Sequence, residues 1–168
     1  MKTINIYGDN SFAEHSKVRE ACRGIVVQDG MILLTYEVNT DQWFIPGGGL
    51  EDAETIRECC IRELSEETGF SVDPLDHFLT INEYYEEWLF ISYYFVCKIT
   101  GKTNRQLTVR ETEVGLEPRW IPLQEAVNIF SKHQVYAHDE MKRGAYLREH
   151  NALTVFQGKT GIDLNHLK

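Results

Sequence analysis

The chain has 168 residues, 42% of them hydrophobic and 26% charged, and its formal net charge is −9 at pH 7. This composition is typical of one globular domain and excludes the disordered and fibrous classes. The acidic balance argues against binding of nucleic acid or anionic lipid across the surface, and the polar N-terminus and short apolar runs argue against a signal peptide or membrane span, so we expect a cytoplasmic protein.

The first predicted element is a hairpin over residues 22–38, CRGIVVQDGMILLTYEV. Its two strands are rich in Val, Ile and Leu, and they join at Asp29-Gly30, a dipeptide that tolerates the positive φ of a tight turn. The next residues predict a short strand that ends at Pro46. The chain then opens into a glycine-rich loop, Gly47–Gly49.

A helix is predicted after this loop, over about residues 53–68. Asp52 is expected to cap its N-terminus through a side-chain oxygen. Gly69 follows the last helical residue and supplies the left-handed conformation that ends the helix.

The second half of the chain predicts further strands and two more helices. Residues 76–100 are dense in aromatic and β-branched types, which indicates two strands with a turn near Glu86 and Glu87. A polar loop over residues 101–117 precedes a short strand through Trp120. Pro122 opens a helix over residues 122–130, and residues 138–153 predict another.

This order of elements, without a repeat or linker, predicts a single α/β domain over residues 1–168 with a mixed sheet. About 15 N-terminal and about 10 C-terminal residues are expected to be peripheral to it. The four cysteines show no CxxC spacing and the six histidines no metal-binding pattern. We therefore expect reduced, buried thiols and no zinc site.

The predicted helix over residues 53–68 carries an unusual set of acids. Glu63 and Glu67 continue the apolar stripe that begins at Ile56 and Cys60, and Glu66 lies about 60° outside it. Like charges at this spacing repel one another, and acids near a helix C-terminus also oppose its macrodipole. An ordinary amphipathic helix would have apolar residues at these positions.

Some positive charge must compensate these acids unless they form a solvated helix end. Arg62 is expected to reach one of them, because it lies about 80° or more from Glu63 and Glu67 around the helix. A divalent cation can compensate all three acids. Carboxylate oxygens with a carbonyl from the glycine loop suit Mg²⁺ or Mn²⁺.

The spacing of this segment matches a known signature. Gly48 is followed after five residues by Glu54 and after seven more by RELSEETGF, residues 62–70. The segment resembles the signature box of the Nudix hydrolases at every fixed position. The preceding hairpin, the turn at Pro46 and the later strand through Trp120 stand where that family has them.

The resemblance implies a Nudix-type α/β/α sandwich around a mixed β-sheet. It also implies a hydrolase that cleaves a diphosphate linkage in a nucleoside diphosphate joined to another moiety. The implied metal ligands are the side chains of Glu63, Glu66 and Glu67 with the carbonyl of Gly48, and the implied cofactor is Mg²⁺ or Mn²⁺. Glu54 and Arg62 become a pair that holds the loop against the helix, while Gly47, Gly48 and Gly49 let the backbone approach the phosphates.

The general base stays open. In the family the base is either a box glutamate, here Glu66, or a glutamate of a downstream loop. The downstream candidates are Glu111, Glu113 and Glu117, and of these we select Glu113 as the predicted catalytic residue.

Two further residues are candidate substrate contacts. Arg23 stands on an otherwise apolar strand face and needs an anion, either a substrate phosphate or an intramolecular carboxylate. Tyr85, with Tyr84 and Trp88, could stack on a base or belong to the core. Lys102, Arg105 and Arg110 in the polar loop are expected to be solvated.

The substrate is not specified by these residues. A proline typical of ADP-ribose pyrophosphatases is replaced by Tyr84, and Tyr85 falls in the window typical of dinucleoside polyphosphate hydrolases. We expect a small nucleotide, either a nucleoside triphosphate or a dinucleoside polyphosphate, and neither a nucleic acid nor a membrane. The alternative functions are a non-catalytic nucleotide sensor and an ADP-ribose or nucleotide-sugar pyrophosphatase. The sequence does not decide whether the protein forms a homodimer.

Overall fold

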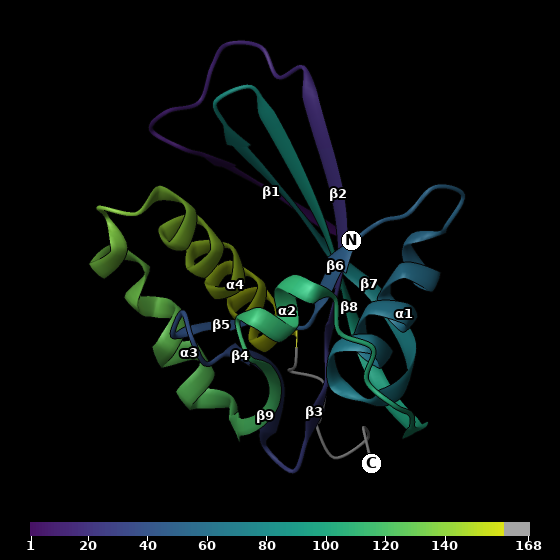
Figure 1. Cartoon of the computed structure of the whole chain (residues 1–168). Helices are drawn as coiled ribbons and strands as arrows, with labels where there is room; N and C mark the ends of the chain where they lie inside the picture. The colour runs from purple at the N-terminus through teal and green to yellow at the C-terminus, as the bar shows by residue number, and fades with distance from the viewer. Residues whose placement is uncertain (160–168) are drawn as a thin grey trace.

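The computed structural model describes residues 1–159 of the chain. A five-stranded mixed sheet forms its centre, in the order β1-β7-β8-β2-β6 (Figure 1). β1 runs parallel to β7 and β2 runs parallel to β8, whereas β7 with β8 and β2 with β6 are antiparallel. The strands are β1 (Lys2–Tyr7), β2 (Lys17–Ile25), β6 (Gly47–Gly49), β7 (Phe70–Tyr85) and β8 (Trp88–Lys102).

A second, four-stranded antiparallel sheet stands beside the first. β4 pairs with β3, β5 and β9. These strands are β3 (Val27–Gln28), β4 (Met31–Glu37), β5 (Gln42–Phe44) and β9 (Leu116–Pro122).

Helices cover both sides of the central sheet (Figure 1). They are α1 (Ile56–Thr68), α2 (Val109–Glu113), α3 (Leu123–Ser131) and α4 (Glu140–Lys159), with a 3₁₀ turn over Lys132–Tyr136. One buried cluster lies under α1 and contains Leu64, and a larger one lies under α3 and α4 and contains Phe130 and Phe156. The expected α/β fold with a mixed sheet is confirmed. Within residues 1–159 no helix is long and apolar enough to cross a membrane.

Most of the predicted elements are present. The hairpin turns at Asp29 and Gly30, with φ values of 50° and 76°, as the dipeptide predicts. β7 and β8 are joined at Glu86-Glu87, and α3 begins directly after Pro122. These elements agree because local turn and helix-start chemistry decides them.

The predicted start of α1 is wrong. Its N-cap is Thr55, whose side chain accepts a hydrogen bond from the Glu58 amide, while the Glu58 carboxylate accepts one from the Thr55 amide. Asp52 is not the cap, and Ala53 has a φ of 63°, which no right-handed helix accommodates. The reciprocal capping box after a turn outweighs a single aspartate.

Two other regions differ from expectation, and a third lies almost entirely outside the described residues. β1 pairs along its whole length with β7, so the first residues form a sheet edge that their polar composition concealed. The loop predicted over residues 101–117 contains the short helix α2, which Thr108 caps. The expected fraying of the last ten residues concerns a segment that, apart from Lys159, lies outside the described residues.

A buried ion network holds α4 on the central sheet. The side chain of Glu149 is fully buried; its carboxylate accepts hydrogen bonds from Tyr94 Oη at 2.9 Å and from Arg148 Nη2 at 2.9 Å, and lies 3.6 Å from Arg23 Nη1. Arg148 also pairs with the buried Glu83 at 3.1 Å. Each charge in this network therefore has an opposite charge, which its burial requires.

Removal of Glu149 should destabilise the fold strongly, because two arginines would stay buried without their shared anion. We expect Glu149→Ala to lower the free energy of unfolding by about 3–5 kcal/mol. The exposed Glu125 of α3 is the control, and its Ala variant should change that free energy by about 0.5 kcal/mol or less. Urea denaturation followed by circular dichroism measures both, and equal effects would contradict the role of the network.

Candidate functional site

The glycine segment predicted as a loop is the short strand β6 in the structure, because it pairs with β2, and this glycine loop lies directly against the acids of α1. Gly47 donates its amide to Glu67 Oε2 at 2.8 Å, and it has a φ of 146°. A Cβ at Gly47 would lie 2.0 Å from the carbonyl oxygen of Cys22, and one at Gly48 would lie 2.4 Å from Glu63 Oε2. Glycine is therefore required for this close approach of the loop to the helix and to β2.

A thiol fills the space beneath the loop. Cys59 Sγ lies 3.6 Å from the Gly48 carbonyl and 3.5 Å from the Gly49 carbonyl. All four cysteines are free and buried. In this cluster they act as small apolar side chains that support the loop and helix from below.

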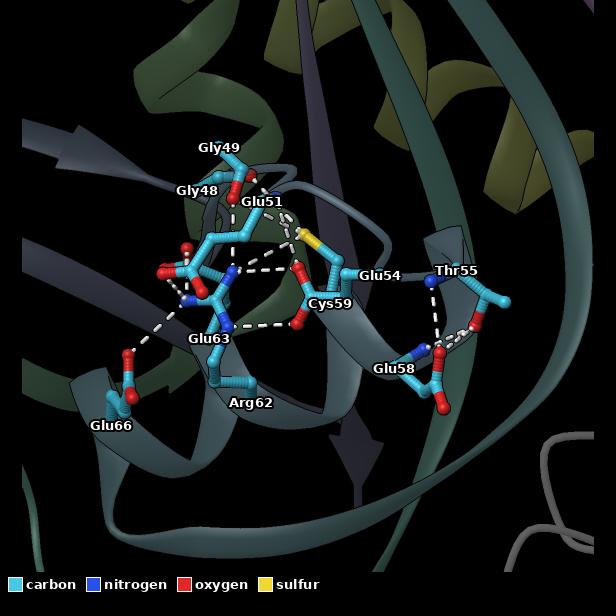
Figure 2. A network of polar contacts seen from close by, with 10 residues as sticks. All are labelled: Gly48, Gly49, Glu51, Glu54, Thr55, Glu58, Cys59, Arg62, Glu63 and Glu66. Carbon is cyan, nitrogen blue, oxygen red and sulfur yellow. Dashed lines mark hydrogen bonds and ion pairs between the residues drawn. The ribbon is translucent and has the colours of Figure 1, made fainter.

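Arg62 lies at the centre of the acids (Figure 2). Its guanidinium donates to both oxygens of Glu54 at 2.8 and 2.9 Å, to Glu63 at 2.8 Å and to Glu66 at 3.3 Å. It also donates to the Gly49 carbonyl at 3.0 Å. The expectation that Arg62 reaches only one acid is wrong, because the long side chain turns back over the helix and its fork has five donors.

The paired contact between Arg62 and Glu54 joins the loop to the helix. The side chain of Glu54 is only 13% exposed, and its pKa is lowered, chiefly by the hydrogen bonds from Arg62. This bidentate geometry is the strong form of an arginine–carboxylate contact. It agrees with the holding role that the sequence resemblance implies.

Two acids of α1 are buried. Burial raises the pKa of Glu67 to about 8, although the Gly47 amide and Arg23 oppose the shift. Burial also raises the pKa of Glu63, against the opposing effect of Arg62. Glu66 is half-buried and borders the same group. The site therefore holds carboxyl groups whose charge the protein compensates only in part.

Arg105 compensates the C-terminal end of α1. Its Nε donates to the Glu67 carbonyl at 2.8 Å, and its Nη2 donates to the Leu116 carbonyl. A cation at this end offsets the macrodipole, which the acids oppose. Arg105 is exposed, as expected, and it also binds these two carbonyls, beside which only the tertiary path of the loop brings it.

The donor set fits a hard divalent cation. Glu63, Glu66, Glu67 and the Gly48 carbonyl offer only oxygen, which suits Mg²⁺ or Mn²⁺, and the incomplete compensation of the buried acids leaves room for added positive charge. Within residues 1–159 no three His, Cys, Asp or Glu side chains are grouped to hold an ion. The carboxylates are engaged by Arg62 and the Gly47 amide. The ligand roles stay a prediction.

The candidate substrate contacts lie on the opposite side of the sheet from α1. Arg23 donates to the Ile45 carbonyl at 3.0 Å and pairs with Glu149, so the intramolecular alternative is present. Its buried Nε has no hydrogen-bond partner among the described residues. The ring of Tyr85 fills space that Gly8 and Gly144 leave open. Binding of substrate by Arg23 and Tyr85 stays a prediction.

The downstream acids differ in their positions. Glu111 is half-buried in α2 and contributes to the raised pKa values of both Glu63 and Glu67. Glu113 is exposed, and Glu117 pairs with Arg119. The side chain of Arg110 is 69% exposed, as expected, and it also pairs with the buried Glu37 at 3.0 Å. Of the three acids, Glu111 is the one whose charge acts on Glu63 and Glu67. Its carboxylate accepts a hydrogen bond from the Thr108 amide at 2.8 Å, and the roles of Glu111, Glu113 and Glu117 stay predictions.

Comparison with known proteins agrees with this geometry. The family described as the NUDIX domain matches residues 18–143. A Caenorhabditis elegans protein that carries the name nudix hydrolase 1 is 33% identical over 118 residues, which are 66% of this chain and 31% of that protein. Mouse diphosphoinositol polyphosphate phosphohydrolase 3-alpha is 24% identical over 107 residues, 64% of this chain and 63% of that protein.

A solved structure supports the fold. The NUDIX hydrolase from Nitrosomonas europaea superposes with a TM-score of 0.56 at 22% identity, covering 81% of this chain and 90% of that one. The chain spans less than two thirds of the length of the two curated relatives named above. These similarities show the family and the fold of the chain. The reaction has to be inferred from the residues of the site.

The contact of Gly47 with β2 predicts a large effect of one methyl group. We expect Gly47→Ala to lower the free energy of unfolding by about 3 kcal/mol or more, because positive φ and a backbone clash add. Gly30→Ala is the control: it also has positive φ, at 76°, but nothing lies within 4 Å of its Cβ position. That variant should lose only about 1–2 kcal/mol. Thermal denaturation distinguishes the two, and equal losses would show that φ strain alone matters.

Proposed function

Because the chain belongs to the Nudix family, we propose that it is a Mg²⁺- or Mn²⁺-dependent pyrophosphohydrolase acting on a nucleoside diphosphate joined to another moiety. The observation that carries the proposal is the unit formed by the glycine loop and α1. In this unit Glu63 and Glu67 are buried beside Gly47 and Gly48, and Arg62 joins helix to loop. A purely structural helix gains nothing from two buried acids.

The residues of the site divide the work of the reaction. Arg62 and Glu54 hold the loop at a fixed position on α1, so that the Gly48 carbonyl and the three acids keep one mutual arrangement. When bound, a divalent cation would neutralise diphosphate charge, polarise a phosphorus centre and lower the pKa of water. The acids that would hold it are Glu63, Glu66 and Glu67. Glu66 is the least buried of them, and it is the box residue best exposed to accept a proton from water.

The substrate proposal is a nucleoside triphosphate or a dinucleoside polyphosphate. The aromatic side chains at the end of the β7–β8 hairpin support a substrate with a base. The mouse relative is named for a diphosphoinositol polyphosphate, which makes a substrate without a base the first alternative. The intact acid cluster counts against a sensor without turnover.

Loss of one acid should abolish most of the activity. In a screen of nucleoside diphosphate derivatives with Mg²⁺ or Mn²⁺, we expect Glu66→Gln and Glu67→Gln each to lower kcat by about 10²-fold or more. Chelation by EDTA should have the same effect. Asp52→Asn, which removes one exposed charge beside α1, should leave kcat within about twofold. Full activity in both glutamine variants would overturn the proposed roles.

The downstream acids can be separated by a matched pair of variants. Glu111→Gln keeps the capping box of α2, because glutamine serves at this position as well as glutamate. If Glu111 accepts the proton from water, this variant should lower kcat about 10²-fold or more, whereas Glu113→Gln should stay near wild type. The opposite order would favour Glu113, and two unaffected variants would favour Glu66 as the base. Product chromatography under saturating substrate measures kcat of the wild type and of both variants.

A further inference from the structure

Arg19 differs from every other arginine of the chain. Among residues 1–159, its guanidinium alone has no hydrogen bond and no ion pair, and its side chain is exposed. The other arginines donate to carboxylates or carbonyls: Arg23, Arg57, Arg62, Arg105, Arg110, Arg119, Arg143 and Arg148. In a protein with a net charge of −9, a cation left without an acid is open to an external anion.

A set of aromatic rings stands beside Arg19. Trp88 and Phe90 are half-buried, and their rings are nearly parallel, with centroids 5.4 Å apart and an interplanar angle of 17°. The ring of Tyr85 lies 6.4 Å from Phe90, and Lys17 Nζ lies 5.3 Å from the centre of the Trp88 ring. This end of β8 therefore presents a flat apolar surface.

Strand register places these groups on one face. Arg19 of β2 is the direct neighbour of Phe90 of β8, and Lys17 is that of Trp88. Side chains at alternate positions share a face, so Arg19 also shares its face with Arg23, about 13 Å further along β2. The other face at this end carries Tyr7 stacked on Tyr84.

The same face leads to the glycine loop. β6 pairs with β2, with Ala21 opposite Gly49, and a Cβ at Gly49 would lie 3.8 Å from Arg19 Nη2. The order across the strands is therefore Phe90, Arg19 and then the loop that rests on the acids of α1. The hairpin end of β7 and β8 extends beyond α1 (Figure 1). The aromatic rings lie on the face of the sheet opposite α1, because they share that face with Arg23, and they are partly exposed.

We propose that Phe90, backed by Trp88, stacks against the base of a nucleotide whose phosphate is held by Arg19, with the diphosphate directed toward Gly47–Gly49. The inference rests on the proposed function and gives its substrate a definite class. A stacking platform, a free guanidinium and a glycine loop match the order of base, phosphate and diphosphate in one nucleotide. A substrate without a base would use Arg19 but would gain nothing from Phe90.

The test measures binding with two analogues that cannot be cleaved at the bridging position. Adenosine 5′-(α,β-methylene)diphosphate carries a base, and methylenediphosphonate does not. Titration calorimetry in Mg²⁺ buffer should give at least about fivefold tighter binding of the nucleotide analogue to the wild type. Phe90→Leu should remove that preference, and Phe90→Tyr, which keeps an aromatic face, should retain it.

Arg19 has a separate expected effect. Arg19→Gln should weaken binding of both analogues by about tenfold, because both lose a charge-assisted contact. The control variants are Lys98→Gln, which removes an exposed cation of β8, and Tyr7→Leu, which removes an aromatic ring from the opposite face. Both should stay within about twofold of wild type.

Trp88 supplies a second readout. The nucleotide analogue should change the tryptophan emission of the wild type, and Trp88→Phe should abolish that change. An unaltered base preference in Phe90→Leu, unaltered affinity in Arg19→Gln, or an emission change that survives in Trp88→Phe would overturn the inference.

The proposed function fails on a different result, namely absence of turnover across the substrate screen. Binding that depends on Phe90 and Arg19 without turnover would leave this inference standing and remove the proposed reaction. Turnover with binding that does not depend on Phe90 and Arg19 would support the proposed reaction and overturn this inference.

Discussion

The burial of Glu63 and Glu67 on one face of α1 is the constraint around which the site is arranged. Burial of these carboxyl groups raises the pKa of both and disfavours the charged form, and the charge of Glu63 adds to the shift at Glu67. The protein answers with the Arg62 guanidinium, the Gly47 amide and the more distant charge of Arg23. The compensation is incomplete, as the pKa of Glu67 at about 8 indicates, and the acids thus keep an affinity for added positive charge.

The glycines of the loop follow from that burial. The loop has to approach the helix closely enough to donate an amide to one acid and to stack a carbonyl over a thiol. A side chain at Gly47 would collide with β2, and one at Gly48 would displace the Glu63 carboxylate. The glycine segment, which is β6, is therefore in close contact with α1 and β2, and this contact depends on a backbone position at Gly47 that a residue with a Cβ cannot occupy without strain.

The distribution of cations connects this unit to the rest of the molecule. Arg105 stabilises the C-terminal end of α1, and Arg148 and Arg23 neutralise the acids buried under α4. Nearly every guanidinium has an internal carboxylate or carbonyl as its partner. Arg19 is exceptional because its guanidinium has no such partner. Its position between the aromatic surface and the glycine loop is the basis for the proposed phosphate contact.

The sequence by itself determined the elements whose cause is local: the Asp29-Gly30 turn, the end of α1 at Gly69, and the spacing of Glu54, Arg62 and the three acids that identifies the family. It could not determine that Arg62 turns back to several acids, that Arg105 reaches the helix end, or that Arg23 pairs with Glu149, since these contacts join segments far apart in the chain. The strand β1 was missed for the same reason, because its polar residues become a strand only when β7 offers an edge. Turn and cap preferences are short-range properties of the chain, whereas the partner of a long charged side chain is decided by which strands and helices the fold brings beside it.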